Sequence, residues 1–239
     1  MSDRFSDAIA LENNRGYIAV IPDIKCISPK VGNLLQGRDP AEVAQRFVEY
    51  GAPVLSVVTE QSDFGGSLGL LRGITQAVGV PVLRKDFIKS LKMLEETAES
   101  GAAAVLLICA CMDEDMLHTL YDEALALGLE PLVEVHNEQE LALARQLEAR
   151  LIGINNRNIA TLELDEGGPS HTAALASGIP EDALLISESG ILSPEDAHIA
   201  SSAGANAILV GTALWQADDM RSFYQSLRIK KKDSLCALS

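Results

Sequence analysis

One pattern, repeated eight times, constrains the fold of this chain more than any other feature. Each repeat joins a short run rich in Val, Ile and Leu to an amphipathic segment. The runs are YIAVIPDIK, PVLSVVTE, VPVLRKDF, AAVLLIC, EPLVEVH, RLIGINNR, ALLISESG and NAILVGTAL. Runs that are apolar along nearly their whole length indicate strands covered on both faces. Eight such units in 239 residues predict a closed (β/α)8 barrel, the TIM barrel of the α/β class, rather than an open sheet.

Helix signals follow the same rhythm. Glycines stand where helices should stop and prolines where helices should start: Gly51, Gly101, Gly128, Gly178 and Gly204, with Pro40 and Pro194. The segment near HTAALASG is the weakest of the predicted helices. No stretch is long enough for a linker, so we expect residues 1–239 to form one domain. A short N-terminal extension covers about residues 1–16, and a polar tail frays over about residues 229–239.

Composition excludes several classes of protein. A formal charge of -15 argues against nucleic acid and anionic membranes as partners, since both need a basic footprint. No apolar run approaches the roughly 20 residues of a membrane span, and MSDRFSDAIA does not resemble a signal peptide, so we expect a cytoplasmic protein. The four cysteines form no CxxC pair and have no histidine at metal-ligand spacing. We therefore expect reduced thiols, no metal, and a monomer or weak homo-oligomer.

The stretch PDIKCISPK places two charges at the end of the first strand. Side chains two apart share a face, so Asp23 and Lys25 should point inward with Ile21, while Ile24 points outward. A surface ion pair explains this stretch equally well when it is taken alone. Barrel enzymes, however, carry their chemistry at the carboxyl ends of the strands.

Other strands also place polar side chains at this end. Lys85, Glu134 and Glu188 lie late in their strands, and Asn155 and Arg157 share one face of another strand. Lys85 alone can be read as a charged strand end. Glu134, flanked by two valines, is harder to read as solvated, because a buried carboxylate is costly unless it is paired. Together these groups predict a site in the barrel mouth.

Glycines after the last two strands predict a phosphate site. Gly190, Gly211 and Thr212 directly follow the seventh and eighth strands. Barrels often bind phosphate there with backbone N–H groups, which glycine allows to approach closely. Each glycine alone is more often a plain turn residue, but their joint placement favours the phosphate site.

Six motifs carry a resemblance to a known family. In this order and spacing, PDIKCISPK, PVLRKDFI, PLVEVHN, IGINNRNI, ISESGI and AILVGTAL resemble indole-3-glycerol-phosphate synthases, the ring-closing enzymes of tryptophan biosynthesis. The resemblance runs from about residue 18 to about residue 214. RKDFI and IGINNR are the specific motifs, and LVEVHN adds to them.

The resemblance implies roles for individual residues. Lys85 would be the general acid, Glu134 the general base, and Lys25 would bind and activate the substrate. The remaining implied site residues are Asp23, Asn155 and Glu188 in catalysis, Arg157, Ser28, Ser189 and Phe87 in substrate binding, and Gly190, Gly211 and Thr212 at the phosphate. Two departures stand out. Asp23 replaces the usual glutamate, and the N-terminal extension is shorter than the helical one that usually covers the barrel mouth.

The implied reaction closes a pyrrole ring on 1-(2-carboxyphenylamino)-1-deoxyribulose 5-phosphate, with loss of carbon dioxide and water. One ammonium and one carboxylate on opposite walls meet its minimum need, without metal or organic cofactor. Phe64 and Phe87 can stack on the aryl ring, although such residues are more often core. His136 follows Glu134 on the same face, yet a loop position favours a solvated side chain.

Two other interpretations stay open at this point. Phosphoribosylanthranilate isomerase shares the fold and the phosphate site, but it would use a cysteine and an aspartate in place of Lys85 and Glu134. A non-catalytic paralogue that binds a phosphorylated ligand is consistent with Asp23 and the short N-terminus.

Overall fold

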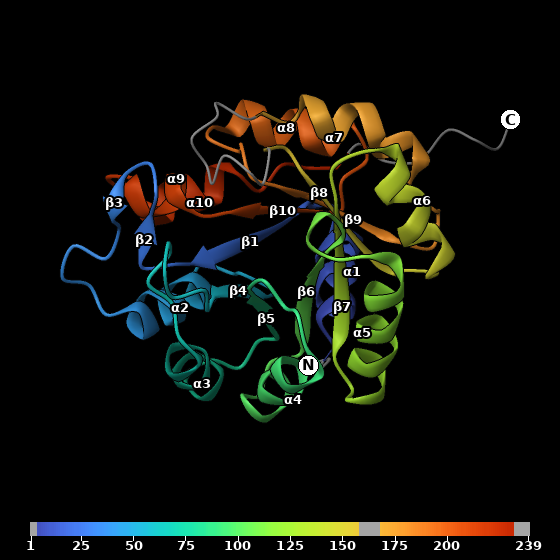
Figure 1. The fold of residues 1–239 in the computed structure, drawn as a ribbon. Helices are drawn as coiled ribbons and strands as arrows, with labels where there is room; N and C mark the ends of the chain where they lie inside the picture. Colours follow the sequence, from blue (N-terminus) through green and yellow to red (C-terminus); the bar gives the residue numbers. More distant parts are fainter. Residues whose placement is uncertain (1–3, 158–167, 232–239) are drawn as a thin grey trace, which may run out of the picture.

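The strands of the computed structural model, which describes residues 4–157 and 168–231, form the predicted barrel. Eight parallel strands close in the order β1-β10-β9-β8-β7-β6-β5-β4 (Figure 1). Their bounds are β1 Ala19–Ile24, β4 Leu55–Val58, β5 Val82–Lys85, β6 Ala104–Ile108, β7 Glu130–Val135, β8 Leu151–Asn155, β9 Leu184–Glu188 and β10 Ala207–Val210. Strands adjacent in the sequence are therefore adjacent in space, and the (β/α)8 prediction is confirmed.

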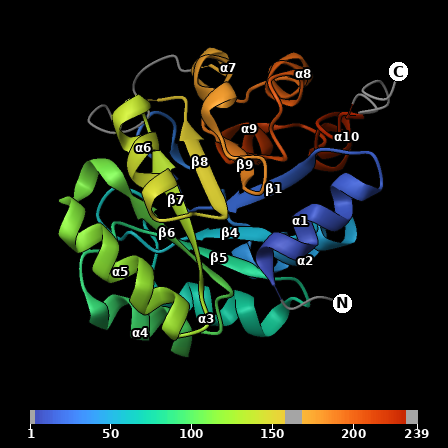
Figure 2. The ribbon, with the colours of Figure 1, turned by 90° about the vertical axis from the view of Figure 1, so that its right-hand side faces the viewer.

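Helices follow the strands and surround the barrel (Figures 1 and 2). They are α2 Pro40–Glu49, α3 Leu68–Ala77, α4 Leu91–Glu99, α5 Glu114–Ala126, α6 Glu138–Gln146, α7 Ser170–Leu175, α8 Pro194–Ser202, α9 Thr212–Gln216 and α10 Met220–Ser226. Side-chain caps start many of them, at Asp39, Ser67, Ser90, Asp113, Asn137, Ser193 and Asp219. These caps accept backbone N–H groups that the first helical turn leaves unpaired. The predicted starts at Pro40 and Pro194 are confirmed.

The core has two layers. One cluster fills the barrel interior and includes Ile21, and another lies between the sheet and the helices and includes Ile24. The inward and outward faces predicted for the first strand are therefore confirmed. Strand parity places Asp23 and Lys25 in the barrel mouth.

The N-terminal segment closes the end of the barrel opposite the mouth. Figure 2 shows helix α1 (Phe5–Asn14) beside the strands, and its Phe5 and Ile9, both fully buried, belong to the inner cluster. The Ser6 N–H donates to Glu130 at the start of β7 (3.1 Å), and Asn13 Nδ2 donates to the Asn206 carbonyl just before β10 (2.8 Å). The described N-terminal residues thus seal the amino end of the barrel instead of covering its mouth.

The first residues of the predicted frayed tail are paired with the rest of the chain. The Ile18 N–H donates to the Ile229 carbonyl (2.9 Å), and the Lys231 N–H donates to the Gly16 carbonyl (2.9 Å). Residues 229–231 therefore pair with the chain ahead of β1, and the rest of the expected tail lies outside the described residues. In the part of the chain that the structure describes, no helix is long and apolar enough to cross a membrane.

Candidate active site

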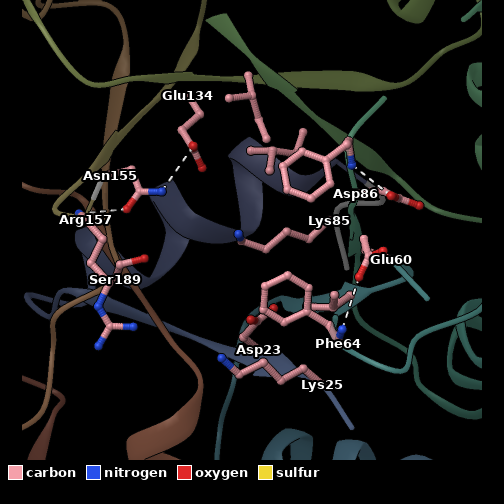
Figure 3. A pocket seen from close by; sticks show the side chains of 14 residues that line it. Asp23, Lys25, Glu60, Phe64, Lys85, Asp86, Glu134, Asn155, Arg157 and Ser189 are labelled. Atoms are coloured by element: carbon pink, nitrogen blue, oxygen red, sulfur yellow. Dashed lines mark hydrogen bonds between the residues drawn. The ribbon is translucent and has the colours of Figure 1, made fainter. Parts of the chain in front are cut away.

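Two adjoining cavities lie at the carboxyl ends of the strands. Asp23, Lys25, Lys85, Arg157 and Ser189 line both of them. The first cavity also holds Phe64, Phe87, Glu134 and Asn155, whereas the second holds Gly190, Gly211 and Thr212. The mouth is thus divided into an aromatic, acid–base half, shown in Figure 3, and a glycine-lined half.

Most of the predicted site residues meet at these cavities, and two do not. Ser28 is buried in the short hairpin of β2 (Ile27–Ser28) and β3 (Gly32–Asn33), and Glu188 is fully buried at the end of β9. Neither of them is among the residues that line the two cavities. Glu188 instead lies beneath the site, next to Glu134.

Adjacent charges in the third barrel strand point in opposite directions. Lys85 extends into the middle of the first cavity (Figure 3). Arg84, 3% exposed, lies behind the sheet, where its Nη2 pairs with Asp86 Oδ2 (2.9 Å) and its Nε donates to Thr59 Oγ1 (2.9 Å). Arg84 and Asp86 therefore form an ion pair that supports the structure, and Lys85 between them lines the cavity.

Asp23 and Lys25 are buried site residues, which rules out the surface ion pair. They are only 5% and 2% exposed. Ser56, the residue opposite Asp23 on β4, donates its hydroxyl to Asp23 Oδ1 (2.7 Å). A Cβ on Gly211 would lie 3.3 Å from Lys25 Cε and 3.4 Å from Asp23 Oδ2. Gly211 therefore leaves room for both side chains where β1 and β10 end.

Glu134 at the end of β7 is 1% exposed, and within the described ranges only one of its two carboxylate oxygens is hydrogen-bonded. Asn155 Nδ2 donates to its Oε1 (3.1 Å), while no hydrogen-bond partner for Oε2 exists among the described residues. Glu188 lies next to it, and neither Glu188 oxygen has a described hydrogen-bond partner. Burial, followed by the charge of Glu134, raises the pKa of Glu188 well above its ordinary value, although Lys85 acts in the opposite direction. Burial and the neighbouring charge therefore favour the protonated, neutral form of Glu188.

The expectation of a solvated His136 is wrong. Its side chain is only 14% exposed, and its Nε2 lies 3.4 Å from Glu134 Oε1. On the other side, Nδ1 lies 3.1 Å from Glu140 Oε2. The first turn of α6 brings Glu140 back against the end of β7, an arrangement that strand parity alone does not reveal.

Sequence reasoning also missed Glu60 and Asn156. The Glu60 carboxylate accepts the N–H groups of Ser62, Asp63 and Phe64 at 2.7 to 3.1 Å and so shapes the turn that carries Phe64. The Phe64 ring centroid lies 5.7 Å from Lys25 Nζ. Asn156 Nδ2 donates to the carbonyls of Glu188 and Ser189 at 2.9 and 3.0 Å. In the sequence, the position of Glu60 just after a strand is the only feature that points to a site role. Asn156 is marked only by lying between Asn155 and Arg157.

The glycine-lined cavity has an unusual backbone. Ser189 and Gly190 both adopt positive φ, at 62° and 68°, a conformation that is rare for serine. Thr212 Oγ1 is buried without a hydrogen-bond partner among the described residues. An unpaired buried hydroxyl and a turned backbone give this cavity polar groups that a bound anion would satisfy.

The three cysteines that the structure describes do not line the site. Cys26, Cys109 and Cys111 are free thiols, and none of them is among the residues of the two cavities. Burial, helped by the charges of Glu140 and Glu134, raises the pKa of Cys109 to about 12. Among these three described cysteines, none could serve as the acid or base that the isomerase alternative needs in these cavities. Within residues 4–157 and 168–231 no cluster of His, Cys, Asp and Glu could hold a metal ion.

This fold and this site define a (β/α)8-barrel enzyme with acid–base groups beside a glycine-lined polar cavity. The profile of one family, "Indole-3-glycerol phosphate synthase", matches residues 2–227. The indole-3-glycerol phosphate synthase of Thermococcus kodakarensis is 46% identical over 209 residues, which cover 87% of this chain and 91% of the relative. Those of Pyrococcus abyssi and a Nocardioides species are 43% and 45% identical, over 87% and 82% of this chain and 90% and 74% of the relatives. The chain belongs to the indole-3-glycerol phosphate synthase family.

Proposed function

We propose that this site closes the indole ring of 1-(2-carboxyphenylamino)-1-deoxyribulose 5-phosphate, releasing carbon dioxide and water to form indole-3-glycerol phosphate. The observation that carries the proposal is the presence of Lys85 and Glu134 in one cavity, beside a second cavity lined by Gly190, Gly211 and Thr212. The family match supports the same reaction.

Lys85 is the general acid. Its ammonium delivers a proton to the ketone oxygen, which makes the carbonyl carbon electrophilic enough for attack by the aryl carbon. General acid help of this kind contributes about 10²- to 10⁴-fold. Lys25 and Arg157 bind the substrate carboxylate and stabilise the charge that develops before carbon dioxide leaves. Phe64 and Phe87 line the same cavity and stack on the aryl ring.

Glu134 is the general base. Asn155 holds one carboxylate oxygen, which leaves the other to take a proton from the substrate as the hydroxyl departs. The raised pKa of Glu188 favours its neutral form beneath Glu134, which disfavours a second negative charge next to the base. Two neighbouring carboxyl groups thus have two different roles, set by burial.

The phosphate binds in the second cavity. Backbone N–H groups near Gly190 and Gly211 and the hydroxyl of Thr212 supply its hydrogen bonds, with Ser189 at the boundary between the two halves. Local groups of this kind are needed because the chain carries a net charge of -15, which repels anions. No metal or organic cofactor takes part in these steps.

Turnover of the parent chain and of Lys85→Met, followed by indole fluorescence, tests the proposal. We expect an active parent and a loss of at least about 10²-fold in kcat for Lys85→Met. Lys92→Met is the matched control, because Lys92 on α4 is 80% exposed and remote from the cavities. A parent that binds inorganic phosphate without turnover would support the non-catalytic paralogue instead.

The remaining parts of the proposal are a cytoplasmic location and a monomeric or weakly associating chain. Cell fractionation tests the first, and light scattering across a concentration series tests the second.

A further inference from the structure

His136 lies between the proposed base, Glu134, and a second carboxylate, Glu140. His136 lies in the turn between β7 and α6, with Nε2 3.4 Å from Glu134 Oε1 and Nδ1 3.1 Å from Glu140 Oε2. Glu140 Oε2 also accepts the backbone N–H of His136 (2.7 Å), and Asn137 Nδ2 donates to Glu140 Oε1 (2.7 Å). These contacts fix the ring, and its Nε2, buried without a hydrogen-bond partner among the described residues, lies near Glu134 Oε1.

A separate cavity lies on the far side of this histidine. It has a volume of about 430 Å³, and His136 and Glu140 line it. Asn155 and Arg157 line both this cavity and the first active-site cavity, so they form the wall between the two. Because one water occupies about 30 Å³ in the liquid, the cavity has room for several waters. Glu134 belongs only to the active-site side.

The charges around His136 suit a group that both takes up and releases protons. Burial lowers its pKa, but the hydrogen bond to Glu140 and the charges of Glu134 and Glu140 outweigh burial, and Lys85 opposes them. The net pKa is raised above the ordinary value. His171 on α7 lies against the His136 carbonyl, and Arg157 borders the same cavity. The ring therefore takes up a proton more readily than an unperturbed histidine does.

The proposed reaction leaves a proton on a buried carboxylate. Two protons are delivered, one to the ketone oxygen and one to the departing hydroxyl, and one is removed from carbon by Glu134. With substrate in the cavity, Glu134, 1% exposed even without it, has no contact with bulk water. The base must release that proton before the next cycle.

We propose that His136, oriented by Glu140, carries this proton from Glu134 to water in the neighbouring cavity. The O–H bond of Glu134 breaks as an N–H bond forms at His136 Nε2, and the imidazolium then gives the proton to cavity water. Glu134 returns to a carboxylate and His136 to a neutral ring, while Lys85, which supplies the two delivered protons in turn, is reprotonated from solvent at the mouth. The inference rests on the proposed function, because it takes Glu134 as the base. His136 acts on the reaction through Glu134, and Glu140 acts through His136. Neither of them contacts the substrate in this proposal.

Comparing the first turnover with steady state tests this path. The variant is His136→Gln, and the matched control is His198→Gln, an exposed position on α8. Since His136 resets the base only after the chemistry, we expect a first turnover within about twofold of the parent and a kcat about 10- to 10²-fold lower. A residue that only positions Glu134 would slow both rates equally. That result, or an unchanged kcat, would overturn the proposal.

Two further variants test proton transfer directly. In His136→Ala we expect added imidazole to restore kcat, whereas pyrazole, a ring of the same shape and much weaker basicity, does not. Rescue by both rings would mean that the ring only fills space. In Glu140→Gln, the lost negative charge lowers the pKa of His136, so the acidic limb of the kcat profile should move to lower pH. A limb that stays in place would contradict the role of Glu140, and an inactive parent chain would refute the proposed function itself.

Discussion

Gly153→Ala tests how tightly the buried carboxyl groups are placed. Gly153 in β8 lies opposite Glu134 in β7, and its missing side chain leaves the space that Glu188 fills. A Cβ at this position would come within 2.0 Å of Glu188 Oε1 and 3.1 Å of its Cδ. Glu188 is fully buried, so its carboxyl group has no solvent to turn into.

The size of the effect follows from that contact. Real Cβ atoms essentially never come closer than 3.0 Å to another heavy atom, so the Glu188 carboxyl group must move by about 1 Å. A misplacement of about 1 Å in a reacting constellation can cost about 10²-fold in rate. Overpacking a filled core typically costs about 1 to 3 kcal/mol in the free energy of unfolding. We therefore expect a variant that is both less stable and much slower.

Steady-state ring closure by fluorescence and urea unfolding measure the two effects separately. The control is Gly73→Ala, at an exposed position in α3 where an added Cβ meets nothing within 4 Å. It should leave the rate unchanged and raise the free energy of unfolding by about 0.5 to 1 kcal/mol. If Gly153→Ala is destabilised but keeps kcat within about threefold of the parent, Glu188 takes no part in the reaction, and the argument from placement fails.

Three other predictions follow from the same site. Asp23→Ala should lower kcat by about 10²-fold, because it removes a buried carboxylate held by Ser56, and Asp23→Glu, assayed beside it, shows whether the site is adapted to aspartate. A parent improved by glutamate would indicate drift from the family reaction. Gly211→Val should raise KM for the phosphorylated substrate more than it lowers kcat, because the added side chain narrows the glycine-lined cavity. An unchanged KM would place the phosphate elsewhere. Glu188→Gln should unfold at higher urea than the parent at pH 7. The raised pKa of Glu188 makes folding lose stability as pH rises above the unfolded value near 4.3, and glutamine removes that loss; equal midpoints at every pH would contradict it.

The sequence alone determined the barrel and much of its mouth. Strand periodicity is local, so alternation within PDIK and INNR sufficed to place Asp23, Lys25, Asn155 and Arg157 on the inner face. Repeated strand–helix units then brought Lys85 and Glu134 to the same end of one closed sheet, because parallel strands start and stop together.

Only the tertiary structure decided which charges serve the site and which serve the scaffold. Arg84 and Lys85 are neighbours in sequence, yet one pairs behind the sheet and the other enters the cavity. Glu188 has the same parity as a cavity residue, but the space opposite Gly153 draws it beneath the site. The loop position of His136 predicts a solvated side chain, but the first turn of α6 places Glu140 against it. These outcomes depend on packing between elements far apart in the chain, and local periodicity carries no information about such contacts.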